Sequence, residues 1–206
     1  MILPRFYPIL DTATAERFRI HPMDAAEQIV HAGAKILQFR HKTFWSREIV
    51  ETMERVAALC RESGVPFIVN DRADLARLAG AGVHLGQEDL LPSNVRPIVG
   101  ARTPIGFSTH NKSQLLAAAK EPADYLALGP IFSTGSKENP DPVVGIDGLR
   151  LLRPLTPRPL VAIGGITRVN AAEVLAAGAD SVAVISDLFP DVLSRAEDWL
   201  ILTKTH

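Results

Sequence analysis

Apolar, β-branched stretches recur along the whole chain, and they alternate between two forms. In the first form a proline precedes the apolar run, and in the second form the run opens on glycine or proline followed by alanine. Each run is apolar at consecutive positions, which is typical of a strand buried on both faces. The first form covers residues 7–11, 65–70, 103–108 and 158–164, and the second covers residues 33–40, 80–87, 122–129 and 178–186. The pattern therefore predicts eight strands.

Helical periods separate the strands. The clearest one follows Ser46, where apolar residues recur at steps of three and four until Gly64 ends the run. This pattern predicts an amphipathic helix with a serine N-cap. Gly33 and Gly178 stand where a helix end needs a left-handed residue. Weaker patterns predict helices over residues 24–32, 111–119, 147–153, 169–177 and 187–202, and shorter ones over 73–79 and 92–99.

Strands that alternate with helices pair in parallel, and eight such units define an α/β fold, a (β/α)8 TIM barrel. We expect residues 1–206 to form this single barrel domain. A flat, doubly wound sheet is the alternative. The barrel is preferred because the repeat continues evenly to eight and no GxGxxG turn follows the first strand.

One unit of the repeat is longer than the others. The interval from Pro104 to Pro159 exceeds that from Pro66 to Pro104 by about one helix length, and the extra residues follow the sixth predicted strand. Residues 129–145 are too rich in glycine, proline and hydroxyl side chains for a helix. We interpret this segment as a long active-site loop, with a surface insertion as the alternative.

Composition restricts the partners and the compartment. The chain has 206 residues, is 47% hydrophobic and carries a net charge of −1, with no basic run. Nucleic acid and a membrane surface are therefore not expected as partners. The single cysteine, Cys60, excludes an internal disulfide, and the N-terminus lacks the features of a signal peptide, so we expect a cytoplasmic protein. The composition is compatible with both a monomer and a homo-oligomer.

Polar residues follow the predicted strands, and in a parallel barrel these ends meet at one rim. Asp71 and Asp89 end the third and fourth strand regions, so they are candidates to share one Mg2+ ion, although either could instead cap the next helix. Arg40, Lys42, Lys137 and Asn70 would complete a site suited to a diphosphate. Gln38 and Ser108 end the second and fifth strands.

A second anion site is predicted after the last two strands. Gly164 and Gly165 follow the seventh strand, and Ile185 and Ser186 end the eighth. With a helix capped by Thr167, these turns would form the phosphate site common in barrels. Thr134 and Ser136 lie in the long loop. Among these rim residues the sequence shows no nucleophile with an adjacent base, which argues against covalent catalysis.

The chain resembles the thiamine phosphate synthase family in six blocks, which are residues 38–42, 69–72, 82–89, 105–110, 129–137 and 163–166. The resemblance covers nearly the whole chain. It implies transfer of a hydroxymethylpyrimidine group from its diphosphate to hydroxyethylthiazole phosphate, with magnesium, to give thiamine phosphate and pyrophosphate. The substrates are thus small molecules.

The resemblance also implies roles for individual residues. Asp71 and Asp89 would hold magnesium, and the catalytic charges and hydroxyl would come from Lys137, Arg40, Lys42 and Ser108. Substrate contacts would come from Gln38, Phe39, Arg40, His41, Lys42, Asn70, Ser108, Thr134, Gly135, Ser136, Lys137, Gly165, Ile185 and Ser186.

Three residues depart from the family pattern. His41 stands where the family usually has an acidic residue, Phe39 where leucine is usual, and Ser136 where a second threonine is common. Ser136 keeps a hydroxyl group. We interpret His41 as a partly exposed histidine without a role, with altered substrate choice as the alternative.

Two other functions remain open. A thiazole tautomerase, an isomerase that resembles the synthase, should lack the full set of cations, and it has a histidine where this chain has Pro130. A non-catalytic barrel that binds a phosphate ligand is the second alternative.

Overall fold

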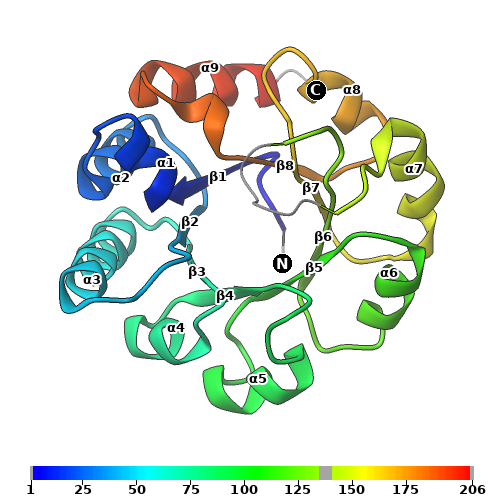
Figure 1. Cartoon of the computed structure of the whole chain (residues 1–206), viewed down its shortest axis with the longest axis horizontal. Coiled ribbons are helices and arrows are strands. Elements are labelled where there is room, and N and C mark those ends of the chain that lie inside the picture. The colour runs from blue at the N-terminus through cyan, green and yellow to red at the C-terminus, as the bar shows by residue number, and fades with distance from the viewer. Residues whose placement is uncertain (1, 135–140, 205–206) are drawn as a thin grey trace.

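A computed structural model describes residues 2–134 and 141–204 of the chain. Its centre is a closed barrel of parallel strands in which each strand pairs with the next and β8 pairs with β1 (Figure 1). The strands are β1 Phe6–Asp11, β2 Leu37–Arg40, β3 Phe67–Asn70, β4 Gly82–Leu85, β5 Ile105–Thr109, β6 Tyr125–Leu128, β7 Leu160–Ala162 and β8 Ser181–Val184. The predicted barrel is confirmed, and the flat sheet is excluded by the β1–β8 pairing.

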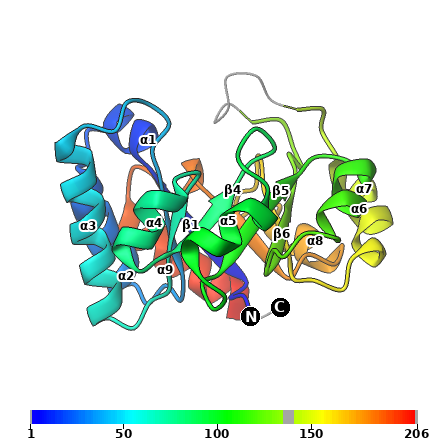
Figure 2. The ribbon, with the colours of Figure 1, turned by 90° about the horizontal axis from the view of Figure 1, so that it is seen from below.

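Helices surround the barrel on all sides (Figures 1 and 2). The α-helices are α1 Thr12–Arg17, α2 Pro22–His31, α3 Arg47–Glu62, α4 Ala73–Ala79, α5 Pro92–Val99, α6 Lys112–Ala118, α7 Gly145–Leu152, α8 Ala171–Ala176 and α9 Val192–Lys204, and two 3-10 helices are η1 Arg153–Leu155 and η2 Ser186–Leu188. None of the helices described is both long and apolar enough to cross a membrane.

The predicted helices are present, with local differences. Ser46 caps α3 as expected, since its side chain accepts a hydrogen bond from the Ile49 N–H. The sequence pattern missed α1, whose six residues are too few to show a helical period. The prediction that one helix runs from Asp187 is wrong, because η2 and an extended stretch precede α9. The N-cap expected at Thr167 is also wrong, because α8 begins only at Ala171.

Two separate hydrophobic clusters stabilise the barrel. The larger one fills the layer between strands and helices, and in it Phe6 of β1 stacks on Trp199 of α9 with ring centroids 5.6 Å apart. The smaller cluster fills the inside of the barrel, as interior side chains do in this fold. It consists of Leu3, Tyr7, Ile9, Ile36, Ile68, Tyr125, Ala127, Val161 and Ala183. The two tyrosines bring hydroxyl groups into this interior, just below the functional rim.

Candidate active site

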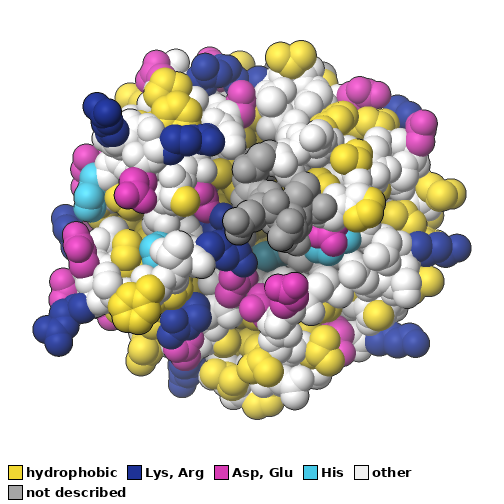
Figure 3. Space-filling model, in the orientation of Figure 1, with side chains coloured by type: hydrophobic (Ala, Val, Ile, Leu, Met, Phe, Trp, Pro, Cys, Tyr) yellow, Lys and Arg dark blue, Asp and Glu magenta, His cyan; other side chains and the backbone are white. Residues whose placement is uncertain are grey.

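A cavity of about 690 Å³ opens at the carboxyl end of the barrel. Residues from all eight strands or from the loops after them line it, and basic and acidic side chains lie next to each other near the centre of this face (Figure 3). Binding sites of (β/α)8 barrels lie at this end because the loops after the strands converge there. The position of the cavity therefore makes it the candidate active site.

The cations of the site are supplied by the end of β2. Gln38, Arg40 and Lys42 all line the cavity, since alternate residues of a strand face the same side. Arg40 forms an ion pair with Asp11, and Lys42 Nζ donates to Asp71 Oδ2 at 2.5 Å. Each cation thus has a carboxylate partner that holds it at the rim.

Asp11 links the cation site to a helix start. Its carboxylate is buried, and Oδ1 accepts hydrogen bonds from the N–H of Thr14 at 2.8 Å and from its hydroxyl at 2.7 Å, while Oδ2 pairs with Arg40. One side chain therefore caps α1 and positions the guanidinium. Asp11 was not among the predicted site residues, although it ends the first predicted strand as Asp71 follows the third.

We predict that Asp11→Asn lowers the free energy of unfolding by about 2 kcal/mol, because hydrogen bonds to charged groups contribute roughly 1.5–3 kcal/mol. Asp11→Ala should cost about 1 kcal/mol more through loss of the N-cap. Urea unfolding measures both values. The matched control is Asp147→Asn, which removes the partner of Arg150 at an exposed position of α7 and should change little. Equal effects of the Asp11 and Asp147 changes would contradict this role of Asp11.

Asp71 and Asp89 lie together at the ends of β3 and β4. Asp71 adopts a left-handed backbone with φ of 64°, which is uncommon for a residue other than glycine and recurs at functional sites. Asp89 Oδ2 accepts a hydrogen bond from the Gly86 N–H at 2.7 Å. Burial raises the pKa of Asp89 to about 6, and the adjacent Asp71 carboxylate acts in the same direction. Neither aspartate caps the helix that follows it, so the helix-cap alternative is not supported.

This pair of carboxylates fits a magnesium ion. The Asp71 carboxylate disfavours ionisation of Asp89, and a divalent cation between the two side chains would offset this effect. Mg2+ commonly binds one or two carboxylates and takes its other ligands from water and substrate phosphates. Within residues 2–134 and 141–204, no cluster of three or more acidic, histidine or cysteine side chains is positioned to hold a metal.

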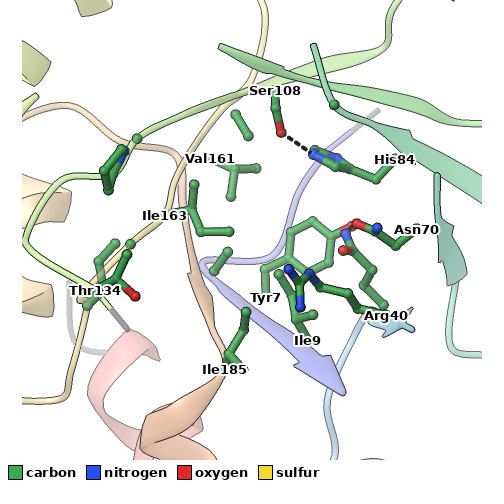
Figure 4. A pocket seen from close by; sticks show the side chains of 18 of the residues that line it. Tyr7, Ile9, Arg40, Asn70, His84, Ser108, Thr134, Val161, Ile163 and Ile185 are labelled. Atoms are coloured by element: carbon green, nitrogen blue, oxygen red, sulfur yellow. Dashed lines mark hydrogen bonds between the residues drawn. The ribbon is translucent and has the colours of Figure 1, made fainter. Parts of the chain in front are cut away.

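Polar side chains, most of them buried, form a series of hydrogen bonds below the cavity, and Tyr7, His84 and Ser108 of this series line it (Figure 4). The Gln38 amide donates to the Tyr7 hydroxyl at 3.0 Å, and this hydroxyl lies 2.7 Å from that of Tyr125. His84 continues the chain, with Nδ1 3.1 Å from the Tyr125 hydroxyl and Nε2 2.9 Å from Ser108 Oγ. Burial lowers the pKa of His84 to about 4 and raises those of both tyrosines. All three rings are thus neutral near pH 7.

The contact between Ser108 and His84 corrects a sequence-based expectation, because a hydroxyl group does have an imidazole neighbour at the rim. The pair nevertheless lacks the features of a nucleophilic triad. The partner of His84 Nδ1 is the hydroxyl of Tyr125 rather than a carboxylate, and burial makes the imidazole a weak base. Covalent catalysis therefore remains unsupported.

Asn70 carries the clearest unused hydrogen-bonding capacity in the cavity. Its side chain is buried at the end of β3, and its Nδ2 is the one buried side-chain nitrogen or oxygen atom in the described part of the chain that has no partner. An unpaired buried donor is costly unless a ligand or water occupies it. Its place in the cavity wall therefore points to a ligand acceptor, as predicted for this residue.

On the opposite side of the cavity lie the two glycines that follow β7. Gly164 and Gly165 have φ of 98° and 65°, and a Cβ atom on Gly165 would lie 2.5 Å from the Ser133 carbonyl oxygen. Only glycine fits such a backbone and such a close approach. Gly165, Ile185 and Ser186 all line the cavity. Together they form a concave surface of main chain suited to a phosphate group.

The structure places eleven of the predicted site residues in the cavity wall. These are Gln38, Arg40, Lys42, Asn70, Asp71, Asp89, Ser108, Thr134, Gly165, Ile185 and Ser186. Gly135, Ser136 and Lys137 lie outside the described residues.

Phe39 and His41 do not line the cavity. The ring of Phe39 is fully buried in the outer core, with its centroid 6.1 Å from that of Trp45. His41 Nδ1 lies 2.7 Å from the Thr12 hydroxyl, and its ring meets Trp45 edge-on. Strand alternation turns both side chains away from the site, because Gln38 and Arg40 occupy the inward positions. His41 is half-buried, which agrees with its interpretation as a partly exposed histidine.

Sequence reasoning missed several residues that line or support the site. Tyr7, His84 and Tyr125 lie within predicted strands, where apolar neighbours conceal their inward direction. His110, after β5, also lines the cavity, and its Nδ1 donates to the Gly129 carbonyl oxygen at 2.6 Å. A polar residue within an otherwise apolar strand is the signal that could have identified Tyr7, His84 and Tyr125.

A (β/α)8 barrel with paired carboxylates and cations on one side of its cavity and a glycine turn on the other belongs to the class of enzymes that act on phosphorylated small molecules. Comparison with known proteins then identifies the family. Residues 6–188 match the model of the family described as thiamine monophosphate synthase. The chain therefore belongs to this family, and the predicted transferase class is confirmed.

Individual relatives agree with this assignment. A thiamine-phosphate synthase of Koribacter versatilis is 51% identical over 205 residues, covering 96% of this chain and 95% of its own length. The enzyme of the same name from Chloroflexus aurantiacus is 42% identical and covers 88% and 83%. A solved structure, the thiamine phosphate pyrophosphorylase from Pyrococcus furiosus, is 33% identical, covers 98% and 96%, and superposes with a TM-score of 0.86.

Proposed function

We propose that this chain transfers a hydroxymethylpyrimidine group from its diphosphate to the ring nitrogen of hydroxyethylthiazole phosphate. The products are thiamine phosphate and pyrophosphate. The observation that carries this proposal is that one cavity is lined by Arg40, Lys42 and Asn70 after β2 and β3 on one side and by the turns after β7 and β8 on the other, two regions that each suit an anion. Two phosphorylated substrates need such an arrangement in order to meet.

The pyrimidine diphosphate is assigned to the first region. Arg40 and Lys42 are paired with Asp11 and Asp71 respectively, so both cations are held in place before a ligand arrives. Fixed cations stabilise negative charge without a reorganisation cost during the reaction. The unpaired Asn70 amide adds a hydrogen-bond donor. Gln38 and Ser108 would contact the pyrimidine from the cavity floor.

Asp71 and Asp89 would hold a magnesium ion. When bound, this ion would neutralise charge on the diphosphate. The raised pKa of Asp89 supports the assignment, because burial and the negative neighbour favour a positive partner at this position.

The thiazole phosphate is assigned to the second region. Gly165, Ile185 and Ser186 form its described part, with Thr134 at the edge of the long loop. Gly135, Ser136 and Lys137 follow Thr134 in the sequence, and we assign the first two to the thiazole phosphate and Lys137 to the diphosphate. Residues 129–145 would thus be the active-site loop of a single barrel domain.

In this reaction the protein positions the two substrates and neutralises the charge that develops on the leaving group. The bond between the pyrimidine methylene carbon and the diphosphate oxygen breaks, and its electron pair leaves with pyrophosphate. Arg40, Lys42 and Lys137 stabilise the charge on this leaving group. The electron-rich aminopyrimidine stabilises the carbocation, and the thiazole nitrogen donates its lone pair to form the new carbon–nitrogen bond.

A direct assay tests the proposal. Purified protein should release pyrophosphate only when both substrates and magnesium are present, with thiamine phosphate formed in equal amount. Release without the thiazole phosphate, or isomerisation of the thiazole alone, would favour the tautomerase or hydrolase classes. Binding of either substrate without turnover would leave the non-catalytic barrel as the function. We further propose that the reaction takes place in the cytoplasm.

A further inference from the structure

The polar chain on the cavity floor connects residues that are far apart in the sequence. From Gln38 it passes through the hydroxyls of Tyr7 and Tyr125 to the His84 imidazole and ends at Ser108. Four of these five side chains are buried, and Ser108 at the end faces the cavity (Figure 4). The assigned function uses only the two ends of this chain and leaves its middle unexplained.

A glycine makes room for the middle of the chain. Gly106 of β5 is the strand partner of both His84 on β4 and Tyr125 on β6. A Cβ atom at position 106 would lie 2.3 Å from His84 Nδ1 and 2.4 Å from the Tyr125 hydroxyl. Any other residue there would separate the histidine from the tyrosine. The contact across β5 is thus built into the barrel rather than being a chance proximity.

The donors and acceptors along this chain follow one direction. The Gln38 amide N–H donates to Tyr7, so the Tyr7 hydroxyl has its hydrogen available for Tyr125. If Tyr7 donates to Tyr125, the Tyr125 hydroxyl can donate to His84 Nδ1 at 3.1 Å, and the imidazole hydrogen then lies on Nε2, 2.9 Å from Ser108 Oγ. In the opposite direction the Tyr7 hydrogen would have no acceptor among these contacts, although the residue is only 1% exposed. With Gln38 Nε2 facing Tyr7, as in this structure, each buried group is satisfied only in the first direction.

We infer that this series of hydrogen bonds from Gln38 to Ser108 holds His84 in the Nε2–H tautomer. Ser108 then receives a hydrogen bond from the protein and presents its own hydroxyl hydrogen to the ligand. Tyr7, Tyr125 and His84 are then positioning residues that make Ser108 a hydrogen-bond donor in the cavity. The ligand atom opposite Ser108 must be an acceptor. Given the proposed function, on which this part rests, that acceptor is a ring nitrogen of the pyrimidine.

The tautomer can be measured without any substrate. In 15N-histidine-labelled full-length protein near pH 7.5, two-bond 1H–15N correlation spectra should show His84 with hydrogen on Nε2 and an unprotonated Nδ1. His110 provides an internal reference for a protonated Nδ1, because its Nδ1 donates to the Gly129 carbonyl oxygen, while its Nε2 lies 3.5 Å from Asp141 Oδ2. The His84→Gln spectrum assigns the signal. An Nδ1–H tautomer of His84 in the wild type would overturn the inference.

Variants of residues in this series of hydrogen bonds test the direction in which its hydrogens are donated. Tyr125→Phe should let His84 populate both tautomers, and Gln38→Glu should convert it to the Nδ1–H form, because a carboxylate accepts from Tyr7 instead of donating. The matched control is Thr109→Val, which removes another buried hydroxyl of β5 that donates to the Ala127 carbonyl oxygen at 2.8 Å and is not in the chain. It should leave the His84 signal unchanged. A Tyr125→Phe spectrum identical to that of the wild type would contradict the inference.

Binding of substrate analogues tests the consequence for the ligand. A pyrimidine diphosphate in which the relevant ring nitrogen is replaced by C–H should bind the wild type and Thr109→Val about 10- to 100-fold more weakly than the parent compound, because the Ser108 donor is left unpaired. In Tyr125→Phe this ratio should fall below about 3-fold, since Ser108 is free to turn its hydrogen to His84. An unchanged ratio in Tyr125→Phe would refute the inference that this series of hydrogen bonds orients the Ser108 hydroxyl. The two proposals can fail independently. If the protein released no pyrophosphate but His84 still carried its hydrogen on Nε2, only the proposed function would be wrong.

Discussion

Replacing Lys137 with alanine is expected to lower kcat by about 10²- to 10³-fold, with only a modest rise in KM, because removal of a charge that acts on the leaving group typically costs this much. Thr134 and Asp141, the described residues on either side of this part of the loop, both line the cavity. Single-turnover measurement of pyrophosphate release would separate chemistry from product release.

Two further variants define the role of Lys137. Lys137→Arg should recover little activity, since a planar guanidinium does not replace a compact ammonium at one oxygen. Lys120→Ala is the control for a general loss of positive charge, because Lys120 is exposed after α6 and does not line the cavity. If Lys137→Ala retained nearly the wild-type rate, the leaving-group role would pass to Arg40 and Lys42.

The second large effect is expected at the carboxylate pair. Asp89→Asn should raise the magnesium concentration needed for half-maximal activity at least about 10- to 100-fold, which is the loss typical even for residues that only support a metal ligand. Asp71→Asn should behave similarly. Magnesium titrations of initial rate measure both effects. A magnesium requirement that stayed at the wild-type value in both variants would remove these residues from the metal site.

Although Asp89→Asn should raise the magnesium concentration needed for activity, it should stabilise the folded protein in the absence of magnesium. The pKa of Asp89 is raised to about 6 in the folded protein, above the value of about 3.9 in an unfolded chain. The folded state therefore favours the protonated form, and this stabilisation is complete below about pH 4 and lost as the pH rises through about 6. Without magnesium, the Tm of Asp89→Asn should exceed that of the wild type by an amount that grows from pH 4 to pH 7. A constant difference would show that the Asp89 titration does not affect folding.

The repeat of apolar runs was sufficient to predict the barrel, because a strand covered by helices on one side and by the barrel interior on the other must be apolar at consecutive positions. It also located the strand ends, and with them Asn70, Asp71 and Asp89. Short elements were predicted less well. The α1 helix has no detectable period, and the start of α8 at Ala171 rather than near Thr167 depends on the turn that follows the two glycines.

Family resemblance added roles to these positions but not orientations. It placed Phe39 and His41 among the substrate contacts together with Gln38 and Arg40, whereas the structure turns the first two away from the cavity. In β2 the polar residues Gln38 and Arg40 alternate with Leu37 and Phe39, which indicates two different faces but not which of them is the barrel interior. That choice is made when the barrel closes and fixes the pleat of every strand relative to the axis.

The sequence by itself determined the number of strands, their order, and the rim where polar residues would gather, because these follow from local periodicity and from the convergence of parallel strand ends. The tertiary structure alone decided which side chains meet. Tyr7 and Tyr125 are 118 positions apart, and His84 and Ser108 are 24 positions apart, yet each pair forms one hydrogen bond. Such contacts depend on strand register and on the space left by Gly106, which are properties of the closed barrel and not of any one segment.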